Sequence, residues 1–288
     1  MAERVALSIA GSDPSGGAGI QADLKTFAAH EIFGTTAISA ITVQNTTSVE
    51  EVVPLDPRLV AAQVTAVVND MEVSAVKTGM LATPEIISTV ADLARSGLLA
   101  NLVVDPVLYS STGGSLMAEG GIRAYRELLF PFATVLTPNV FEAAQLTARP
   151  LDQLTTTEEI EEAARELLSL GAQHVVVTGG PFQIESDVHM TDRGTRSEES
   201  MDVLVGHDGS TILRSRLVST LNDHGTGCSF SAAIAAHLAN GAEVQEAVRS
   251  AKAFVRTALW SARSWHIGSG RGPIDHLAGS DRRRVNIR

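Results

Sequence analysis

Short apolar runs alternate with longer amphipathic segments along most of the chain. The apolar runs are rich in Val, Ile and Ala and do not alternate with polar residues, which is typical of strands covered by helices on both faces. The predicted strands span residues 4–10, 34–42, 74–78, 101–106, 133–138 and 173–179. The predicted helices span residues 20–30, 57–71, 84–97, 158–171, 227–241 and 243–262. This order predicts an α/β three-layer sandwich with a mostly parallel central sheet and helices on both faces.

Two segments depart from this alternation. Residues 183–218 contain short polar and β-prone pieces, which predict a small β-hairpin region. Residues 273–288 form a polar, basic C-terminal tail that we expect to be partly loose. No linker, repeat or low-complexity tract interrupts the rest, so we predict a single domain over residues 1–272.

Composition narrows the class of protein. The chain has 288 residues, of which 44% are hydrophobic, so it can bury a sizeable core. A net charge of −11 and a pI near 5.2 argue against a nucleic-acid-binding protein, which normally carries a basic face. The first residues lack the long apolar core of a signal peptide, and no run approaches the ~20 residues of a membrane span. One cysteine cannot form an internal disulfide, which suits a reducing compartment, and we expect a cytoplasmic protein without membrane contact.

Glycine, proline and polar residues gather where the predicted strands end. In open α/β folds, ligands bind at the carboxyl ends of the strands. The residues at these ends are Gly11, Gln44, Thr78, Gly79, Met80, Asp105, Pro106, Val107, Thr137, Pro138, Asn139, Thr178, Gly179 and Gly180. The sequence therefore predicts a binding cleft along this edge of the sheet.

A first glycine-rich segment, AGSDPSGGAGIQADL, follows the first predicted strand and opens the first helix. Its Gly17, Gly19 and Ala22 fit the dinucleotide-binding spacing, but the acidic residue expected at the end of the second strand is replaced by Gln44. No Gly-Lys-Ser/Thr follows any glycine cluster, which excludes a Walker loop. A binding loop and an ordinary strand-to-helix turn both remain compatible with this segment.

A second glycine-rich segment, DHGTGCSFSAAIA, is more specific. The backbone of Gly225, Thr226 and Gly227 can approach an anion without hindrance, and the following helix offers unpaired N–H groups and its positive dipole end. Cys228, the only cysteine, lies in the first helical turn, where this field is expected to lower the pKa of the thiol. The alternative is a small buried apolar residue, which most free cysteines are.

Six segments in this order resemble the hydroxymethylpyrimidine and phosphomethylpyrimidine kinases of thiamine biosynthesis, which belong to the ribokinase-like superfamily. The segments are IAGSDPSGGAGIQADLKTF, TVQNT, KTGML, VVDPV, LTPNVFEAAQL and HGTGC. The similarity extends from about Val5 to about Gly272 and is least distinct in the hairpin region. It implies a ribokinase-like fold and, in solution, a homodimer.

The resemblance also implies an activity and a set of site residues. The expected reaction is ATP-dependent phosphorylation of 4-amino-5-hydroxymethyl-2-methylpyrimidine, followed by a second transfer that gives the diphosphate. The residues that match the family's anion hole are Gly225, Thr226 and Gly227, and Cys228 matches its catalytic base. The residues that match its pyrimidine pocket are Asp23, Gln44, Met80 and Val107.

For ATP and Mg²⁺, the resemblance points to Asp105, Asn139 and Glu142, with Asp105 and Glu142 nearest the metal. Asn139 and Glu142, three residues apart, also fit an ordinary capping box at the start of a helix. Two positions depart from the family. Thr178 stands where members often carry a lysine that contacts the ATP phosphates, and Asp223 adds a carboxylate that could shift the magnesium preference. His224 is expected to have a structural role.

Three other functions stay open. A pyridoxal kinase of the same fold would also phosphorylate a hydroxymethyl group on a heteroaromatic ring. Some such relatives use a cysteine in the lid, where this chain has Ser110 and Ser111. A nicotinamide-dependent oxidoreductase would explain the first glycine segment but leaves Cys228 without a role. A non-catalytic binding protein would keep the pocket without turnover.

Overall fold

One nine-stranded sheet forms the centre of the molecule, in the part of the chain described by the computed structural model (residues 3–109, 114, 116–179 and 199–279). The strands are β1 (Val5–Ser12), β2 (Phe33–Gln44), β3 (Val49–Pro54), β4 (Val73–Thr78), β5 (Leu102–Val104), β6 (Val135–Leu136), β7 (His174–Val177), β8 (Glu199–Gly206) and β9 (Gly209–Arg216). Their order across the sheet is β3-β2-β1-β4-β5-β6-β7-β8-β9. The predicted α/β fold is confirmed.

Strand direction divides the sheet into a parallel centre and antiparallel edges. The six strands from β2 to β7 in spatial order are paired in parallel, so their carboxyl ends meet at one edge. At one side β3 pairs antiparallel with β2, and at the other β8 and β9 form an antiparallel hairpin. The sequence predicted this hairpin region but not β3, in which none of the six residues is buried.

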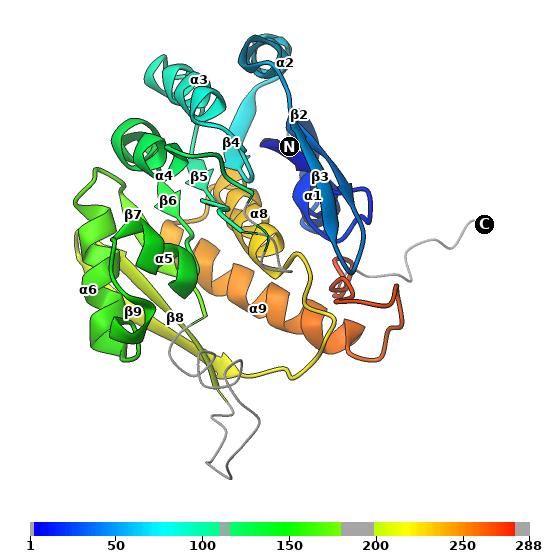
Figure 1. The fold of residues 1–288 in the computed structure, drawn as a ribbon, viewed down its shortest axis with the longest axis vertical. Helices are drawn as coiled ribbons and strands as arrows, with labels where there is room; N and C mark the ends of the chain where they lie inside the picture. The colour runs from blue at the N-terminus through cyan, green and yellow to red at the C-terminus, as the bar shows by residue number, and fades with distance from the viewer. Residues whose placement is uncertain (1–2, 110–113, 115, 180–198, 280–288) are drawn as a thin grey trace.

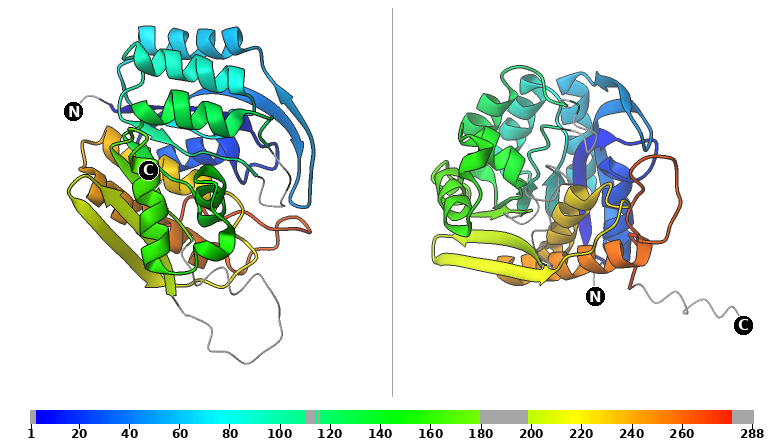
Figure 2. Two further views of the ribbon diagram at one scale, coloured as in Figure 1. Left: turned by 60° about the vertical axis from the view of Figure 1, so that its left-hand side comes forward. Right: turned by 60° about the horizontal axis from the view of Figure 1, so that its bottom comes forward.

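Helices cover both faces of the sheet (Figures 1 and 2). The helices are α1 (Gly19–Ala29), α2 (Pro57–Asp70), α3 (Pro84–Arg95), α4 (Gly121–Ala124), α5 (Val140–Leu146), α6 (Thr157–Leu168), α8 (Thr226–Ala239) and α9 (Val244–Ala262). Successive strand residues point to opposite faces. Val76 and Val104 therefore belong to the core beneath α2, α3, α5 and α6, whereas Ala75 and Val103 belong to the core beneath α8 and α9.

The chain stays packed beyond the expected boundary at residue 272. Ile274, Asp275 and His276 are all buried, and the Asp275 carboxylate accepts a hydrogen bond of 2.7 Å from the hydroxyl of Ser261 on α9. Residues 273–277 are therefore part of the folded unit, because an apolar residue at 274 anchors them. None of the described helices is long and apolar enough to cross a membrane.

Candidate active site

Two glycine loops meet at the carboxyl ends of β1 and β2. The first glycine loop (residues 12–19) connects β1 to α1, and the second glycine loop (residues 223–227) leads into α8. Gly225 has a φ of +83°, and a Cβ atom there would lie 1.8 Å from the carbonyl oxygen of Gly17. Only glycine allows this backbone-to-backbone approach. The structure thus brings together two segments about 200 residues apart.

The start of α8 has the glycine-rich helix terminus on which the prediction of anion binding depends. Gly225 is the N-cap, and Thr226 and Gly227 form the first turn, where N–H groups have no acceptor within the helix. The Thr226 hydroxyl donates to the carbonyl of Asp223 at 2.5 Å, which holds the turn closed. Gly227 is exposed, so its backbone is accessible to a ligand. Phosphate groups bind readily at such a terminus.

Cys228 is partly exposed in this turn, and its sulfur accepts a hydrogen bond from the N–H of Gly19. The predicted lowering of its pKa is wrong. Burial raises the pKa of the Cys228 thiol to about 12, and the nearby Lys77 cation opposes this only in part. The negative charge of Asp105 adds to the effect of burial. The helix terminus does not compensate for lost hydration and a neighbouring carboxylate, so the thiol keeps its proton at neutral pH.

A fully buried lysine on β4 lies beneath the glycine loops. Lys77 Nζ is 2.9 Å from both carboxylate oxygens of Asp23, and both side chains have zero exposure. One of these oxygens also accepts a 2.5 Å hydrogen bond from the Ser8 hydroxyl. Burial alone would lower the pKa of Lys77, but the charge of Asp23 and further negative groups outweigh it and raise that pKa. Lys77 therefore stays a cation.

The contacts of Asp23 differ from those that the family resemblance implies. The resemblance puts Asp23 in the pyrimidine pocket, whereas in the structure its oxygens accept hydrogen bonds from Lys77 and Ser8 below the surface. A buried lysine needs a buried countercharge, and Asp23 supplies it. Sequence reasoning missed Lys77, although a lone charge within the apolar strand SAVKT was a signal.

Met80 and Val107 lie together as predicted, in a small apolar cluster with Ala40 and Ala82. Met80 is buried, and a Cβ atom on Gly11 would lie 2.3 Å from its terminal methyl group. Gln44 is half-buried at the end of β2. These residues lie along one edge of the site, and a contact with a substrate ring stays a prediction for each.

Asp105 and Glu142 form a pair of buried carboxylates on the side of β5 and α5. Burial raises the pKa of Asp105, although Lys77 and the Ser231 hydroxyl at 3.0 Å oppose the change. Burial also raises the pKa of Glu142, and the charge of Asp105 adds to it. Two neighbouring carboxyl groups that do not readily ionise at the same time are a suitable site for a cation, because a cation would offset their negative charges. No cluster of three or more metal-ligating side chains occurs in the described residues. A magnesium ion at this pair would therefore need phosphates and water for its other ligands.

Asn139 and Glu142 also form the predicted capping box. Asn139 Oδ1 accepts a hydrogen bond from the Glu142 N–H, and Glu142 Oε2 accepts one from the Asn139 N–H, each 2.9 Å long. Thr178, at the end of β7, lies beside this box and accepts a backbone hydrogen bond from Val140 at 3.0 Å. Backbone N–H groups of Asn139 and Leu108 thus hold the Glu142 carboxylate in place, and a phosphate contact by Asn139 or Thr178 stays a prediction.

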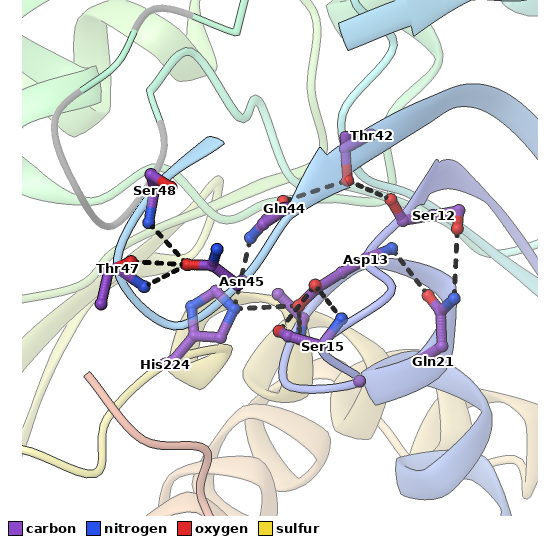
Figure 3. Close-up of polar contacts among 12 residues, drawn as sticks. Ser12, Asp13, Ser15, Gln21, Thr42, Gln44, Asn45, Thr47, Ser48 and His224 are labelled. Carbon is purple, nitrogen blue, oxygen red and sulfur yellow. Dashed lines mark hydrogen bonds and ion pairs between the residues drawn. The ribbon is translucent and has the colours of Figure 1, made fainter. Parts of the chain in front are cut away.

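Two polar residues at the start of the second glycine loop, Asp223 and His224, have partners in the structure. Asp223 pairs with the guanidinium of Arg271, so its charge is already compensated and does not stand free near the phosphate turn. His224 is buried, and its Nε2 lies 2.9 Å from Asp13 Oδ2 in the first glycine loop (Figure 3). The lid serines Ser110 and Ser111 lie outside the described residues.

Comparisons with known proteins place the chain among vitamin kinases. The phosphomethylpyrimidine kinase family matches residues 13–275. A hydroxymethylpyrimidine/phosphomethylpyrimidine kinase of Rhizobium meliloti is 43% identical over 276 residues, covering 95% of this chain and 97% of that protein. A pyridoxine kinase of Bacillus subtilis is 40% identical over 280 residues, covering 96% and 97%.

A solved structure agrees with these relatives. The ADP complex of Bacillus subtilis pyridoxal kinase superposes with a TM-score of 0.82 at 39% identity and covers 96% of this chain and 98% of that one. Similar identities to kinases named for two different vitamins leave the substrate undecided at this level. The chain belongs to the phosphomethylpyrimidine kinase family and is a kinase of that family.

Proposed function

We propose that the protein uses MgATP to phosphorylate 4-amino-5-hydroxymethyl-2-methylpyrimidine and then converts the monophosphate to the diphosphate. The observation that carries the proposal is the meeting of the two glycine loops at the start of α8. This meeting puts the helix terminus of Thr226 and Gly227 beside the Cys228 thiol, whose pKa the charges of Lys77 and Asp105 affect. The family match and the Rhizobium relative support the pyrimidine as substrate.

Phosphoryl transfer needs positioning and charge stabilisation more than covalent chemistry, because its transition state is loose. The N–H groups of Gly227 and Cys228 would receive the transferred phosphoryl group, and the wall of Met80 and Val107 would hold the ring. Asp105 and Glu142 would hold Mg²⁺, which would supply positive charge to neutralise the phosphates. Asn139 would keep Glu142 in place through the capping box.

Cys228 would accept the proton of the hydroxymethyl group as a thiolate, so the thiol of the free protein would first release its own proton to solvent, to which the side chain is partly exposed. The charge of Asp105 is one cause of that raised pKa, so neutralising Asp105 lowers it. Proton acceptance would thus be coupled to metal binding. A general base of this kind contributes roughly 10²–10⁴-fold, and the helix terminus and metal would supply the larger share.

Pyridoxal is the second candidate substrate, favoured by the Bacillus pyridoxine kinase at 40% identity and by the pyridoxal kinase structure. Gln44 argues for the pyrimidine, because a primary amide matches the adjacent amine and ring nitrogen of an aminopyrimidine. Pyridoxal has no such adjacent pair.

Mass spectrometry of the products distinguishes these substrates. The purified protein is incubated with MgATP and either the hydroxymethyl pyrimidine or pyridoxal. Mono- and diphosphates of the pyrimidine are the expected result, and phosphorylation of pyridoxal alone would contradict the proposal. The homodimer implied by the family also stays a prediction, for which light scattering is the measurement.

A further inference from the structure

A chain of polar contacts links the two glycine loops to the end of β2 (Figure 3). Asp13 lies in the first glycine loop, His224 in the second, and Thr42 and Gln44 on β2. His224 Nε2 is 2.9 Å from Asp13 Oδ2 and 3.4 Å from Gln44 Nε2. Thr42 Oγ1 is 3.2 Å from Gln44 Oε1 and 2.7 Å from the carbonyl oxygen of Ser12. The Gln44 amide therefore lies between one imidazole and one hydroxyl.

The position of the imidazole proton follows from Asp13. One carboxylate oxygen of Asp13 accepts the N–H and the hydroxyl of Ser15, at 2.8 and 2.7 Å. The other accepts the N–H of Ala18 at 2.8 Å, so the carboxylate is surrounded by donors. Burial opposes ionisation, but these bonds and His224 together lower the pKa of Asp13 to about 2. The ionised carboxylate has no proton to give, so His224 Nε2 carries the proton of the 2.9 Å bond, whether the ring is neutral or charged.

The position of the Thr42 proton follows in the same way. A hydroxyl has a single proton, and a carbonyl oxygen can only accept. The 2.7 Å contact with the Ser12 carbonyl therefore uses the Thr42 proton. Toward Gln44, Thr42 offers only a lone pair.

These two assignments decide which way the Gln44 amide points. With its oxygen toward Thr42, as drawn in Figure 3, two acceptors face each other. With its nitrogen toward His224, two donors also face each other. Exchanging the amide oxygen and nitrogen, which have almost the same shape, removes both mismatches. The NH₂ group then donates to Thr42, and the oxygen faces the single N–H of His224 Nε2, which it shares at 3.4 Å with the shorter bond to Asp13.

We propose that His224, held by Asp13, is a positioning residue that fixes the orientation of the Gln44 amide and thereby the substrate ring that the site accepts. This inference rests on the proposed function only in naming the ring. The oriented amide keeps one N–H on the Thr42 side and one oxygen lone pair on the His224 side. It therefore selects a ring with an acceptor facing the Thr42 side and a donor facing the His224 side, as an adjacent ring nitrogen and amine provide.

The packing around His224 keeps the imidazole from turning away. The residue is buried, and a Cβ atom on Gly17 would lie 2.4 Å from the His224 ring carbon Cδ2. The backbone N–H of His224 also donates to the carbonyl of Gly272 at 3.0 Å. The His224 N–H therefore stays in one place, from which it can orient the half-buried Gln44 amide. A purely structural role, as expected from the sequence, does not require His224 to face this amide.

The first experiment needs no substrate. In protein labelled with ¹⁵N at glutamine side chains, nuclear Overhauser effects from the Gln44 NH₂ group are expected to the Thr42 methyl group. Long-range ¹H–¹⁵N correlation is expected to show a proton on His224 Nε2. An NH₂ group close to the His224 ring hydrogens, or an unprotonated Nε2, would overturn the inference whatever the enzyme phosphorylates.

The second experiment compares two replacements of His224. His224→Gln keeps an N–H donor near the Nε2 position, whereas His224→Phe keeps a ring and removes the donor. For the phenylalanine variant we expect kcat/KM with the pyrimidine to fall by roughly 5- to 150-fold, mostly through KM, and to fall less with pyridoxal. The glutamine variant should recover most of the loss. An equal fall for both substrates would mean a merely structural role and would overturn the inference.

Thr42→Val gives an independent test should the phenylalanine variant fail to fold. This change keeps the shape of the side chain and removes the acceptor of the Gln44 NH₂ group. The preference for the pyrimidine over pyridoxal should therefore become smaller, as in the His224→Phe variant. An unchanged preference would overturn the inference. If the wild type phosphorylates neither ring, the proposed function fails, while the amide orientation is still decided by the substrate-free experiment.

Discussion

Two polar regions of the site lie against each other and are built differently. The loop network (Asp13, Thr42, Gln44 and His224) consists of directed hydrogen bonds at the ends of strands and in loops. The buried charge cluster (Asp23, Lys77, Asp105 and Cys228) consists of ionisable groups that shift each other's pKa. Under the proposed function, this difference would separate two tasks: the network would determine which ring fits, and the cluster would determine where protons and charge reside during transfer.

Removing the thiol should have the largest effect, because it removes the proposed general base. Cys228→Ala is expected to lower kcat by about 10²–10⁴-fold while the affinity for the pyrimidine changes only a few-fold. Steady-state kinetics and direct ligand titration measure the two quantities. Cys228→Ser is the matched control, since a hydroxyl keeps roughly the size of the group but ionises far less readily than a thiol. Near-normal turnover of the alanine variant would assign Cys228 to packing.

Breaking the ion pair between Lys77 and Asp23 should act mainly on the stability of the folded protein. Lys77→Met leaves the Asp23 carboxylate buried without its cation and is expected to cost about 3–5 kcal/mol in the free energy of unfolding. The double variant Lys77→Met/Asp23→Asn removes the unpaired charge and should recover part of that loss. Urea unfolding of the wild type and both variants is the measurement. An equal loss in the single and double variants would show that packing, not charge, makes Lys77 important.

The two regions also differ in how far the sequence predicts them. The glycine loops, Cys228 and the helix cap at Asn139 are local patterns, and the structure has them where the motifs indicate. Lys77 and its partner are 54 residues apart, and Asp13 and His224 are 211 apart, so their contacts depend on the packing of distant strands. The pKa of Cys228 was predicted with the wrong sign for the same reason: burial and Asp105 are non-local.

The fold likewise has local elements that the sequence predicts and elements that depend on distant contacts. Strands covered on both faces appear in the sequence as apolar runs, and the six that were predicted are present. The edge strand β3 has no buried residue, so its sequence VEEVVP carries no strong apolar signal. The anchoring of residues 273–277 depends on a contact with α9, which a polar tail sequence does not reveal.

Deleting the hydrogen-bonding group of the network should have a smaller and more selective effect. Gln44→Met keeps the length of the side chain and removes both amide positions, so a bound aminopyrimidine would lose its partners. We expect kcat/KM for the pyrimidine to fall at least about tenfold, within the ~1–3 kcal/mol cost of unpaired buried polar groups. We expect kcat/KM for pyridoxal to change less, so the preference for the pyrimidine over pyridoxal becomes smaller. Steady-state kinetics with both substrates measures this, and an unchanged ratio would exclude Gln44 from ring recognition.

The smallest expected effect concerns the pH dependence of stability at Glu142. Burial and the charge of Asp105 raise the pKa of Glu142 from 4.5 to about 8. An acid whose pKa is raised by folding holds its proton more tightly in the folded state. Its contribution to stability is therefore complete below pH 4.5 and is lost as the pH rises toward 8.

Glu142→Gln removes this titration and keeps a side chain that can complete the capping box with Asn139. Without metal, the free energy of unfolding of the wild type should fall more steeply between pH 5 and pH 8 than that of the variant. Urea unfolding at both pH values, in the presence of a chelator, is the measurement. Parallel profiles would mean that Glu142 is ionised in the folded protein throughout this range. Added Mg²⁺ should then stabilise the wild type more at pH 8 than at pH 5, because the cation replaces the proton between Asp105 and Glu142, and it should stabilise the variant less.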